Sequence, residues 1–274
     1  MDKISTAHRI FTFWEPAQSM PPYIRLCLQT WQRFCPEYEI VIVDYSTLDK
    51  WLGKDFFDEI LYSDFSLPKQ ADAIRCALLY KYGGIWLDAD TIITSSDIKE
   101  IFEIKAELVM IDAHLAFIKS NTGGGGNYIL KSWLKDIKKH IRFYKNQKYG
   151  KNKFIKTLQS FINSHKVKNL DEWDYLGNSL LGKYLKAKYG YFRVDKTKIN
   201  ALPESKYLSD SQGLIRNYQS FYFENDFSAE VMKETKGIIL LHNSWTPQDF
   251  LTMNKKEFLT QNNTLSNVFK KILQ

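Results

Sequence analysis

The apolar positions in the N-terminal part of the chain change between the spacing of strands and the spacing of helices. Residues 8–14 and 38–44 are short runs rich in β-branched and aromatic residues, which is typical of buried strands. Between them, residues 22–34 carry apolar residues at helical spacing, and Pro22 suits a first helical turn. This order predicts a right-handed β-α-β unit.

Shorter elements of both kinds continue the alternation on either side of a turn at Gly83 and Gly84. Strands that alternate with helical segments predict an α/β fold. The further elements predicted for this part of the chain are helical pieces at 46–67 and 97–102, a helix at 69–82, and strands at 85–87, 107–113 and 116–120.

The pattern becomes helical and basic after the glycine run NTGGGGN at 121–127, which predicts either a flexible loop or a close approach of two backbones. We expect amphipathic helices with a lysine-rich face at 128–168, and a further helix at 173–189. GIILLHNSW at 237–245 predicts a last strand that ends in polar residues. Without repeats or low-complexity linkers, we predict one domain over 1–274 with a helical addition at about 125–190.

The net charge of +7 favours anionic partners such as nucleotide phosphates, nucleic acid or an anionic membrane, although a simple solubility charge has equal weight. Nucleic acid is disfavoured because no recognised binding module is present. Three cysteines without metal-ligand spacing indicate a reducing compartment. Without a signal peptide or a run of apolar residues long enough to span a membrane, we expect a cytoplasmic protein.

Two carboxylates, Asp88 and Asp90, follow the predicted strand at 85–87 directly. On an extended backbone, side chains two residues apart face the same side, and two such charges repel unless a cation neutralises them. Mg²⁺ and Mn²⁺ prefer such oxygen ligands. A lone Asp-x-Asp pair is often only a solvated turn, but its position at the end of a buried strand favours a metal site.

Asp72 and Arg75 share one face of the helix predicted before this strand. An exposed ion pair of little energetic value would have the same spacing. Because the helix leads directly into the strand that carries Asp88 and Asp90, the face with Asp72 and Arg75 is also placed to look into the same cleft.

The run from Asp72 through GGIWLDAD to Asp90 resembles the sugar-binding motif of glycosyltransferase family 32 and of the related capsular polysaccharide synthesis proteins. It also resembles the catalytic core of glucosylating bacterial toxins. RIFTFW and LCLQTWQRFCPEYEIVIVD are similar to the first β-α-β unit of these families, and HNSW at 242–245 is similar to their C-terminal His-rich segment. The resemblance is dense over 8–120 and returns near the C-terminus.

The resemblance implies a nucleotide-binding fold of the GT-A type, with a Rossmann-like mixed sheet flanked by helices and a helical insertion. It also implies which residues bind and react, with five of them (Asp72, Arg75, Asp88, Asp90 and Trp245) forming the catalytic set. The implied contacts are Asp72, Arg75 and Asp88 with the donor sugar and nucleotide, Asp88, Asp90 and His242 or Asn243 with Mn²⁺ or Mg²⁺, Phe13 or Trp14 with the base, and Ser244 and Trp245 with the diphosphate.

The activity implied by the resemblance is metal-dependent transfer of a hexose, with retention, from a UDP-sugar or, less favoured, a GDP-sugar. The acceptor would be a hydroxyl of a lipid-linked glycan in bacterial capsule synthesis, and the basic helices would contact the inner face of an anionic membrane. One alternative is a toxin-like enzyme that glycosylates a protein. Another is a catalytically silent protein that binds sugar nucleotides.

A few polar residues allow two interpretations. Asn121 is a candidate for contact with the sugar or acceptor, whereas Asp174 and Asn178 are either acceptor-side residues or helix caps. The histidines outside HNSW have no spacing that suggests a metal site and are interpreted as structural or surface residues. They are His8, His114, His140 and His165.

Overall fold

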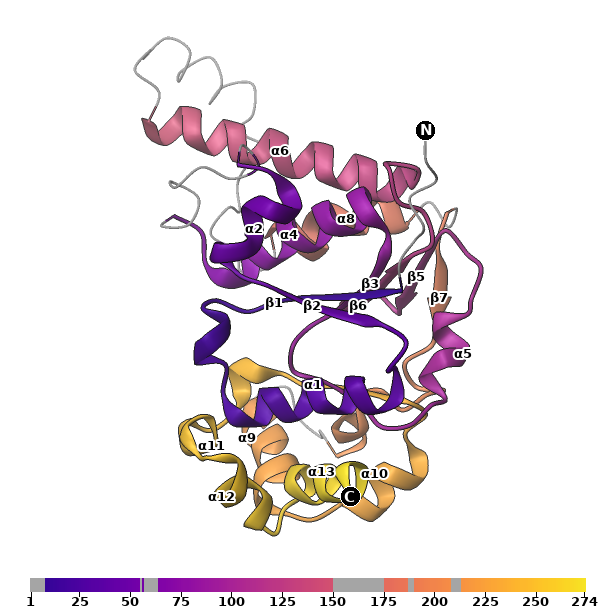
Figure 1. Cartoon of the computed structure of the whole chain (residues 1–274), viewed down its shortest axis with the longest axis vertical. Coiled ribbons are helices and arrows are strands. Elements are labelled where there is room, and N and C mark those ends of the chain that lie inside the picture. Colours follow the sequence, from indigo (N-terminus) through magenta and orange to yellow (C-terminus); the bar gives the residue numbers. More distant parts are fainter. Residues whose placement is uncertain (1–7, 55, 57–63, 150–174, 187–189, 208–212) are drawn as a thin grey trace.

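The computed structural model describes residues 8–54, 56, 64–149, 175–186, 190–207 and 213–274. Its centre is a mixed sheet of six strands in the order β2-β1-β3-β6-β5-β7 (Figure 1). β1 pairs in parallel with β2 and β3, β6 is antiparallel to β3 and β5, and β7 is parallel to β5. The strands are β1 (Arg9–Phe13), β2 (Glu39–Val43), β3 (Gly84–Leu87), β5 (Leu108–Ile111), β6 (His114–Ser120) and β7 (Phe192–Val194).

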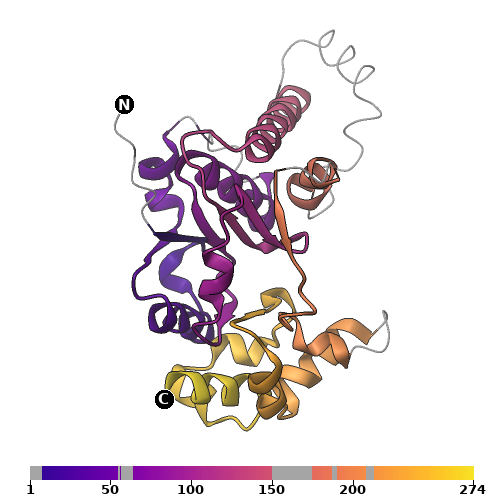
Figure 2. The same ribbon diagram turned by 90° about the vertical axis from the view of Figure 1, so that its right-hand side faces the viewer.

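Helices cover both faces of this sheet, which confirms the predicted α/β class with a mixed sheet (Figures 1 and 2). The layer drawn above the sheet in Figure 1 contains α2 (Tyr45–Leu52), α4 (Leu67–Tyr82), α6 (Tyr128–Tyr149) and α8 (Leu180–Leu185). The layer drawn below contains α1 (Pro22–Phe34), α9 (Leu214–Gln219), α10 (Ser228–Glu234), α11 (Gln248–Thr252), α12 (Lys255–Thr260) and α13 (Thr264–Leu273), while α5 (Ile98–Phe102) lies beside the sheet near β7.

Successive residues of each strand belong to different cores, because side chains alternate across a sheet. Ile85 and Leu87 of β3 pack into the lower core with α1 and α13, whereas Trp86 packs into the upper core with α4 and α6. The sheet is therefore buried on both faces. This alternation decides which layer can reach each side chain at the end of β3.

The sequence predicted the N-terminal β-α-β unit well, and α1 spans the predicted 22–34. It missed β4 (Thr91–Ile93), which pairs with β8 (Ile238–Leu240) in a separate two-stranded antiparallel sheet. It also predicted none of the short helices from α9 to α13. The β4–β8 pair brings the segment after residue 240 back to the end of β3, so it positions the C-terminal part of the site.

Gly84 allows β3 to lie close to β1. Its φ is +87°, and a Cβ at this position would lie 2.9 Å from the carbonyl oxygen of Arg9. Any larger residue would push β3 away from β1. The glycine turn therefore keeps the ends of the two parallel strands side by side.

The run Gly123–Gly126 is a close approach of two backbones at the end of the sheet away from Asp88. The N–H groups of Gly124 and Gly125 donate to the carbonyls of Lys81 and Tyr80. Asn121 lies at the same end, where its amide donates to the carbonyls of Ile104 and Ala106. Because β6 runs antiparallel to β3, Asn121 lies at the end of the sheet opposite to Asp88, so the structure does not bring this candidate for contact with the sugar or acceptor to Asp72 and Arg75.

A buried carboxylate in the lower layer gives a prediction for stability against pH. Glu204 is 2 % exposed, accepts a 2.8 Å hydrogen bond from the Tyr222 hydroxyl, and has its pKa raised to about 7 by burial. A raised pKa means that the folded state holds the proton more tightly than the unfolded state, so stability falls as the pH rises from about 4.5 to 7. Glu204→Gln keeps an acceptor oxygen for the Tyr222 hydroxyl. It has no carboxyl group to titrate, so it should not lose stability in this way. Urea unfolding measures the free energy of unfolding of the variant and of wild type at pH 4 and at pH 8. We expect the difference between the two proteins to shift in favour of the variant by on the order of 3 kcal/mol from pH 4 to pH 8. An equal difference at both pH values would contradict this.

Candidate active site

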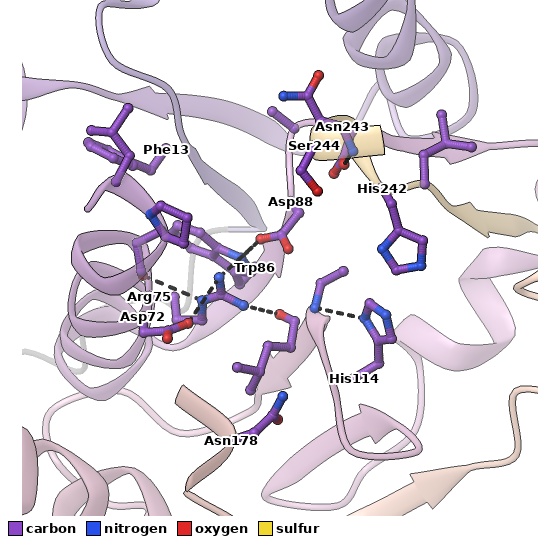
Figure 3. Close-up of a pocket in the computed structure, with 18 of the residues that line it drawn as sticks. Phe13, Asp72, Arg75, Trp86, Asp88, His114, Asn178, His242, Asn243 and Ser244 are labelled. Atoms are coloured by element: carbon purple, nitrogen blue, oxygen red, sulfur yellow. Dashed lines mark hydrogen bonds and ion pairs between the residues drawn. The ribbon is translucent and has the colours of Figure 1, made fainter. Parts of the chain in front are cut away.

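A cavity of about 800 Å³ opens at the end of the sheet where the carboxyl ends of β1 and β3 lie (Figure 3). This volume is in the range of sites that enclose a ligand of nucleotide size. It forms where ligands bind in open α/β sheets, outside the carboxyl ends of parallel strands. The predicted site residues that line it are Phe13, Trp14, Asp72, Arg75, Asp88, Asp90, His242, Asn243 and Ser244.

Arg75 is the centre of a buried network in this cavity (Figure 3). Its Nη2 lies 3.3 Å from Asp72 and 3.4 Å from Asp88, and its Nη1 donates a 2.6 Å hydrogen bond to the Leu115 carbonyl. The side chains of Asp72 and Arg75 are each 6 % exposed, so the alternative of an exposed ion pair on the helix is wrong. Because a buried charge needs several partners, Arg75 fixes the position of both carboxylates.

Trp86 is a site residue that was not identified from the sequence. Its indole N–H donates a 2.7 Å hydrogen bond to Asp88, and the Arg75 guanidinium lies over its ring at 5.1 Å. Trp86 and Asp88 are two residues apart at the end of an extended strand, so both face the upper layer. The sequence signal was an indole donor at this spacing from a carboxylate.

Asp88 and Asp90 both line the cavity, as predicted, but a turn and not an extended strand brings them there. The strand ends at Leu87, and a turn follows in which the Thr91 N–H donates to the Asp88 carbonyl. Asp90 accepts a 2.7 Å hydrogen bond from the backbone N–H of Asn243, far away in the sequence. Alternation across a strand holds only while the backbone is extended, and the turn ends it.

The electrostatics of this corner favour a bound cation. Burial, followed by the negative charge of Asp88, raises the pKa of Asp90 to about 7. Burial and the nearby His114 lower the pKa of His242 to about 4, so its imidazole is neutral and able to accept a metal at pH 7. A divalent cation would remove the repulsion that raises the pKa of Asp90.

The side chains fit Mn²⁺ or Mg²⁺ if substrate oxygens complete the coordination. Within the described ranges, no group of three or more His, Cys, Asp or Glu side chains is placed to hold a metal by itself. One or two carboxylates with phosphate oxygens are the usual set for Mg²⁺. The side-chain oxygen of Asn243 is bonded to the Tyr23 hydroxyl, which leaves His242 as the better placed of the two predicted third ligands.

Aromatic side chains form the β1 end of the cavity. Phe13 ends β1 and packs against Tyr45 with ring centroids 6.0 Å apart. The half-buried Trp14 follows it, and the backbone N–H of Trp14 donates a hydrogen bond to the Val43 carbonyl of β2. Either ring offers a flat face at the cavity wall.

Trp245 is the one member of the implied catalytic set that does not line the cavity. Its ring packs against His242 at 4.3 Å and Tyr218 at 5.3 Å between centroids. Its carbonyl accepts a 3.0 Å hydrogen bond from Gln219. In this structure Trp245 therefore supports His242, while Ser244 is exposed at the cavity wall.

His114 lies in the cavity, which corrects its interpretation as a structural or surface residue. It begins β6, and its ring centroid is 5.9 Å from that of His242. The sequence could not reveal this contact, because the two residues meet only through the β4–β8 pairing. His140 is structural, with a 3.0 Å hydrogen bond to Tyr175, His8 is exposed, and His165 lies outside the described residues.

A non-helical residue, Gly177, packs directly against the Asp72 side chain. Its φ and ψ are −88° and −109°, and a Cβ at this position would clash with the Asp72 carboxylate and lie 2.6 Å from Leu115. Asn178 lines the cavity next to it, whereas Asp174 lies outside the described residues. A glycine is therefore needed for this segment to reach Asp72.

The sequence profile of the family described as "Capsular polysaccharide synthesis protein" matches residues 1–236. No curated protein matches the chain. In the part of the chain that the structure describes, no helix is both long and apolar enough to cross a membrane.

Three solved structures are similar to the chain at low identity. Apo GlyE, a glycosyltransferase of Streptococcus pneumoniae TIGR4, has a TM-score of 0.47 at 13 % identity, covering 97 % of this chain and 59 % of GlyE. An active-site mutant of LgtC has a TM-score of 0.43 at 10 % identity, covering 97 % of this chain and 95 % of LgtC. The PaToxG glycosyltransferase has a TM-score of 0.31 at 18 % identity, covering 64 % and 78 %. The chain thus spans about three fifths of the length of GlyE.

Proposed function

The chain belongs to the capsular polysaccharide synthesis protein family, and we propose that it is a metal-dependent glycosyltransferase of the GT-A type. The observation that supports this most is the Arg75 network. It joins Asp72 and Asp88 in one cavity with Asp90 and His242. Asp72, which is placed to bind sugar hydroxyls, thus lies in the same cavity as Asp88 and Asp90, which are suited to bind a cation and a diphosphate.

Each part of the cavity has a role in this proposal. Asp72 and Arg75 bind hydroxyls of the donor sugar, and Phe13 or Trp14 stacks on the base. Mn²⁺ or Mg²⁺ held by Asp88, Asp90 and His242 would neutralise the leaving diphosphate. The Ser244 hydroxyl is a donor for the same charge, and Trp245 supports His242 from outside the cavity.

The proposed reaction moves a hexose, from a UDP-sugar or alternatively a GDP-sugar, to a hydroxyl of a lipid-linked glycan in capsule synthesis. We propose retention by a front-face route, in which the leaving-group oxygen takes the proton of the incoming hydroxyl. The residues near the sugar support this, since Arg75 is bonded to both Asp72 and Asp88 and keeps them from acting as nucleophiles.

A thermal-shift panel of UDP-, GDP- and CMP-sugars with Mn²⁺ tests the proposal, because a ligand that binds only the folded state raises its Tm. We expect one donor to stand out and to be hydrolysed slowly. No shift with any donor would contradict the proposed function. Binding without hydrolysis would favour a silent sugar-nucleotide-binding protein, and transfer to a protein acceptor would favour a toxin-like enzyme.

Gly177 provides a local test of the sugar site. Gly177→Ala should lower kcat/KM for donor hydrolysis at least about tenfold, because its methyl group would displace Asp72. Gly182→Ala in α8 is the matched control, since a Cβ there meets no atom within 4 Å. It should keep full activity and gain about 0.5–1 kcal/mol in stability. Equal activity of both variants would show that Gly177 does not shape the site.

We also propose that α6 lies against an anionic membrane on the cytoplasmic side. Exposed cations repeat along one face of this helix, at Lys131, Lys135, Lys138, Lys139 and Arg142. Reversing Lys131, Lys135 and Lys139 to Glu should weaken binding to phosphatidylglycerol vesicles about a hundredfold or more, since each charge contributes about 1 kcal/mol. The same reversal at Lys233, Lys236 and Lys256, in the lower layer, is the control. Equal losses in the two triple variants would contradict the proposal.

A further inference from the structure

Two cations line the cavity at the β7 end, far from the aromatic residues. The order of the strands in the sheet sets the order of the side chains along the cavity. This order runs from Phe13 on β1 through Asp88 after β3 and His114 on β6 to Arg193 on β7. Lys196 follows β7 and also lines the cavity. β1 and β7 are four strand spacings apart, about 19 Å. Neither cation was identified from the sequence.

Arg193 is held in place but keeps donors available. Its Nε donates a 2.7 Å hydrogen bond to Asp112, whose side chain is 16 % exposed, while the Arg193 side chain is 65 % exposed. Its two terminal nitrogens have no acceptor among the described residues. A guanidinium oriented in this way presents a planar pair of donors, the geometry that matches a phosphate or carboxylate.

Lys196 is half-buried and forms no ion pair in the described part of the chain. The groups that interact with it electrostatically are His114, on the cavity side, and the buried Glu204. Asp195, the adjacent carboxylate, is bonded to the N–H and hydroxyl of Thr197. Lys196 therefore contributes a positive charge to the cavity that no neighbouring carboxylate takes up within ion-pair distance.

We propose that Lys196 and Arg193 form a subsite for an anionic group on the acceptor, a phosphate or a carboxylate close to the hydroxyl that receives the sugar. The inference rests on the proposed function, since it takes the donor to occupy the other end. Phe13, Asp88 and Asp72 account for the base, diphosphate and sugar of a donor. The β7 end lies beyond the donor sugar, where the acceptor enters.

A binding experiment separates this subsite from the donor site. The protein is saturated with the nucleoside diphosphate of its preferred donor and Mg²⁺, so that the donor end is filled. Glucose 1-phosphate, methyl glucuronide and methyl glucoside are then titrated calorimetrically, which compares a phosphate and a carboxylate with a neutral sugar. We expect at least one of the anionic sugars to bind about tenfold more tightly than methyl glucoside. The anionic sugar that binds more tightly shows whether the subsite prefers a phosphate or a carboxylate.

Variants of the lysine assign the effect. Lys196→Gln should remove most of the preference for the anionic sugar, and Lys196→Arg should restore it. Lys198→Gln, an exposed neighbour, is the matched control and should keep the preference. Arg193→Gln provides a second, independent loss if Lys196→Gln alters the fold, which its melting curve would show.

The inference is overturned if neither anion binds wild type more tightly than methyl glucoside, or if Lys198→Gln loses as much as Lys196→Gln. It is also overturned if Lys196→Gln raises the Kd of the nucleotide as much as that of the anionic sugar, because the cations would then serve the donor. None of these results touches the donor panel, so the proposed function would stand. Failure of the panel itself would instead remove the premise.

Discussion

Asp90→Ala should abolish metal-dependent hydrolysis of the preferred donor, lowering kcat/KM about a thousandfold or more, which corresponds to about 4 kcal/mol. The reason is that Asp90 is a half-buried carboxylate that lines the cavity with Asp88 and His242, where the diphosphate would meet the cation. Steady-state kinetics with Mn²⁺ measure the effect. Asp97→Asn, at an exposed carboxylate without a capping hydrogen bond, is the matched control and should retain full activity.

Asp90→Asn adds a readout that is independent of turnover. The pKa of Asp90 is raised to about 7, so in EDTA the wild type should lose stability as the pH rises from about 4 to 7, and Mn²⁺ with the nucleoside diphosphate should restore it. Asp90→Asn should keep only the smaller loss that Glu204 causes and should show no rescue. Urea unfolding at pH 5 and pH 8, with and without Mn²⁺ and the nucleoside diphosphate, checks both. A variant with wild-type turnover and wild-type rescue would place the metal elsewhere.

Arg75→Ala should cost about 3–5 kcal/mol of stability and nearly all activity. It would leave the Asp72 and Asp88 carboxylates without the cation that lies 3.3 and 3.4 Å from them, and the Leu115 carbonyl without its donor. Arg33→Ala, at an exposed arginine in α1, should change stability by less than about 0.5 kcal/mol. Urea unfolding compares the two.

Arg75→Lys separates charge from geometry. An ammonium group keeps the positive charge, but it cannot bridge both carboxylates and the carbonyl as a planar guanidinium does. We expect a folded protein that has lost about 1–3 kcal/mol of stability and most of its affinity for the donor sugar. If Arg75→Lys matched wild type in donor KM and kcat, the bridging geometry would be irrelevant to function.

Local patterns predicted the parts of the site that lie close together in sequence. The spacing of Asp72 and Arg75 on a helix, followed by a glycine turn and a strand, was enough to place them beside Asp88. The bounds of α1 followed from apolar spacing and Pro22. These features depend on one helix or one strand, so periodicity is sufficient to detect them.

The parts that were missed depend on contacts between distant segments. His114 meets His242 only because β4 pairs with β8, and Lys196 reaches the cavity only because β7 joins the edge of the sheet. The turn that carries Asp90 was also missed, because the strand stops at Leu87 and strand ends are poorly marked in sequence. Trp86 was treated as part of a strand, since a buried indole has the same pattern whether or not its N–H binds a carboxylate.

The hydrogen bond between Asp90 and Asn243 joins positions 153 residues apart, which sets the order in which the site can form during folding. Helix α4 and strand β3 close over a short loop, whereas the Asn243 contact requires most of the chain to be in place. On the ribosome, the acidic turn would emerge and pack long before the segment that completes it. The nascent protein would therefore have an incomplete site until β8 and the segment after it had been synthesised. Activity would then indicate that folding is complete.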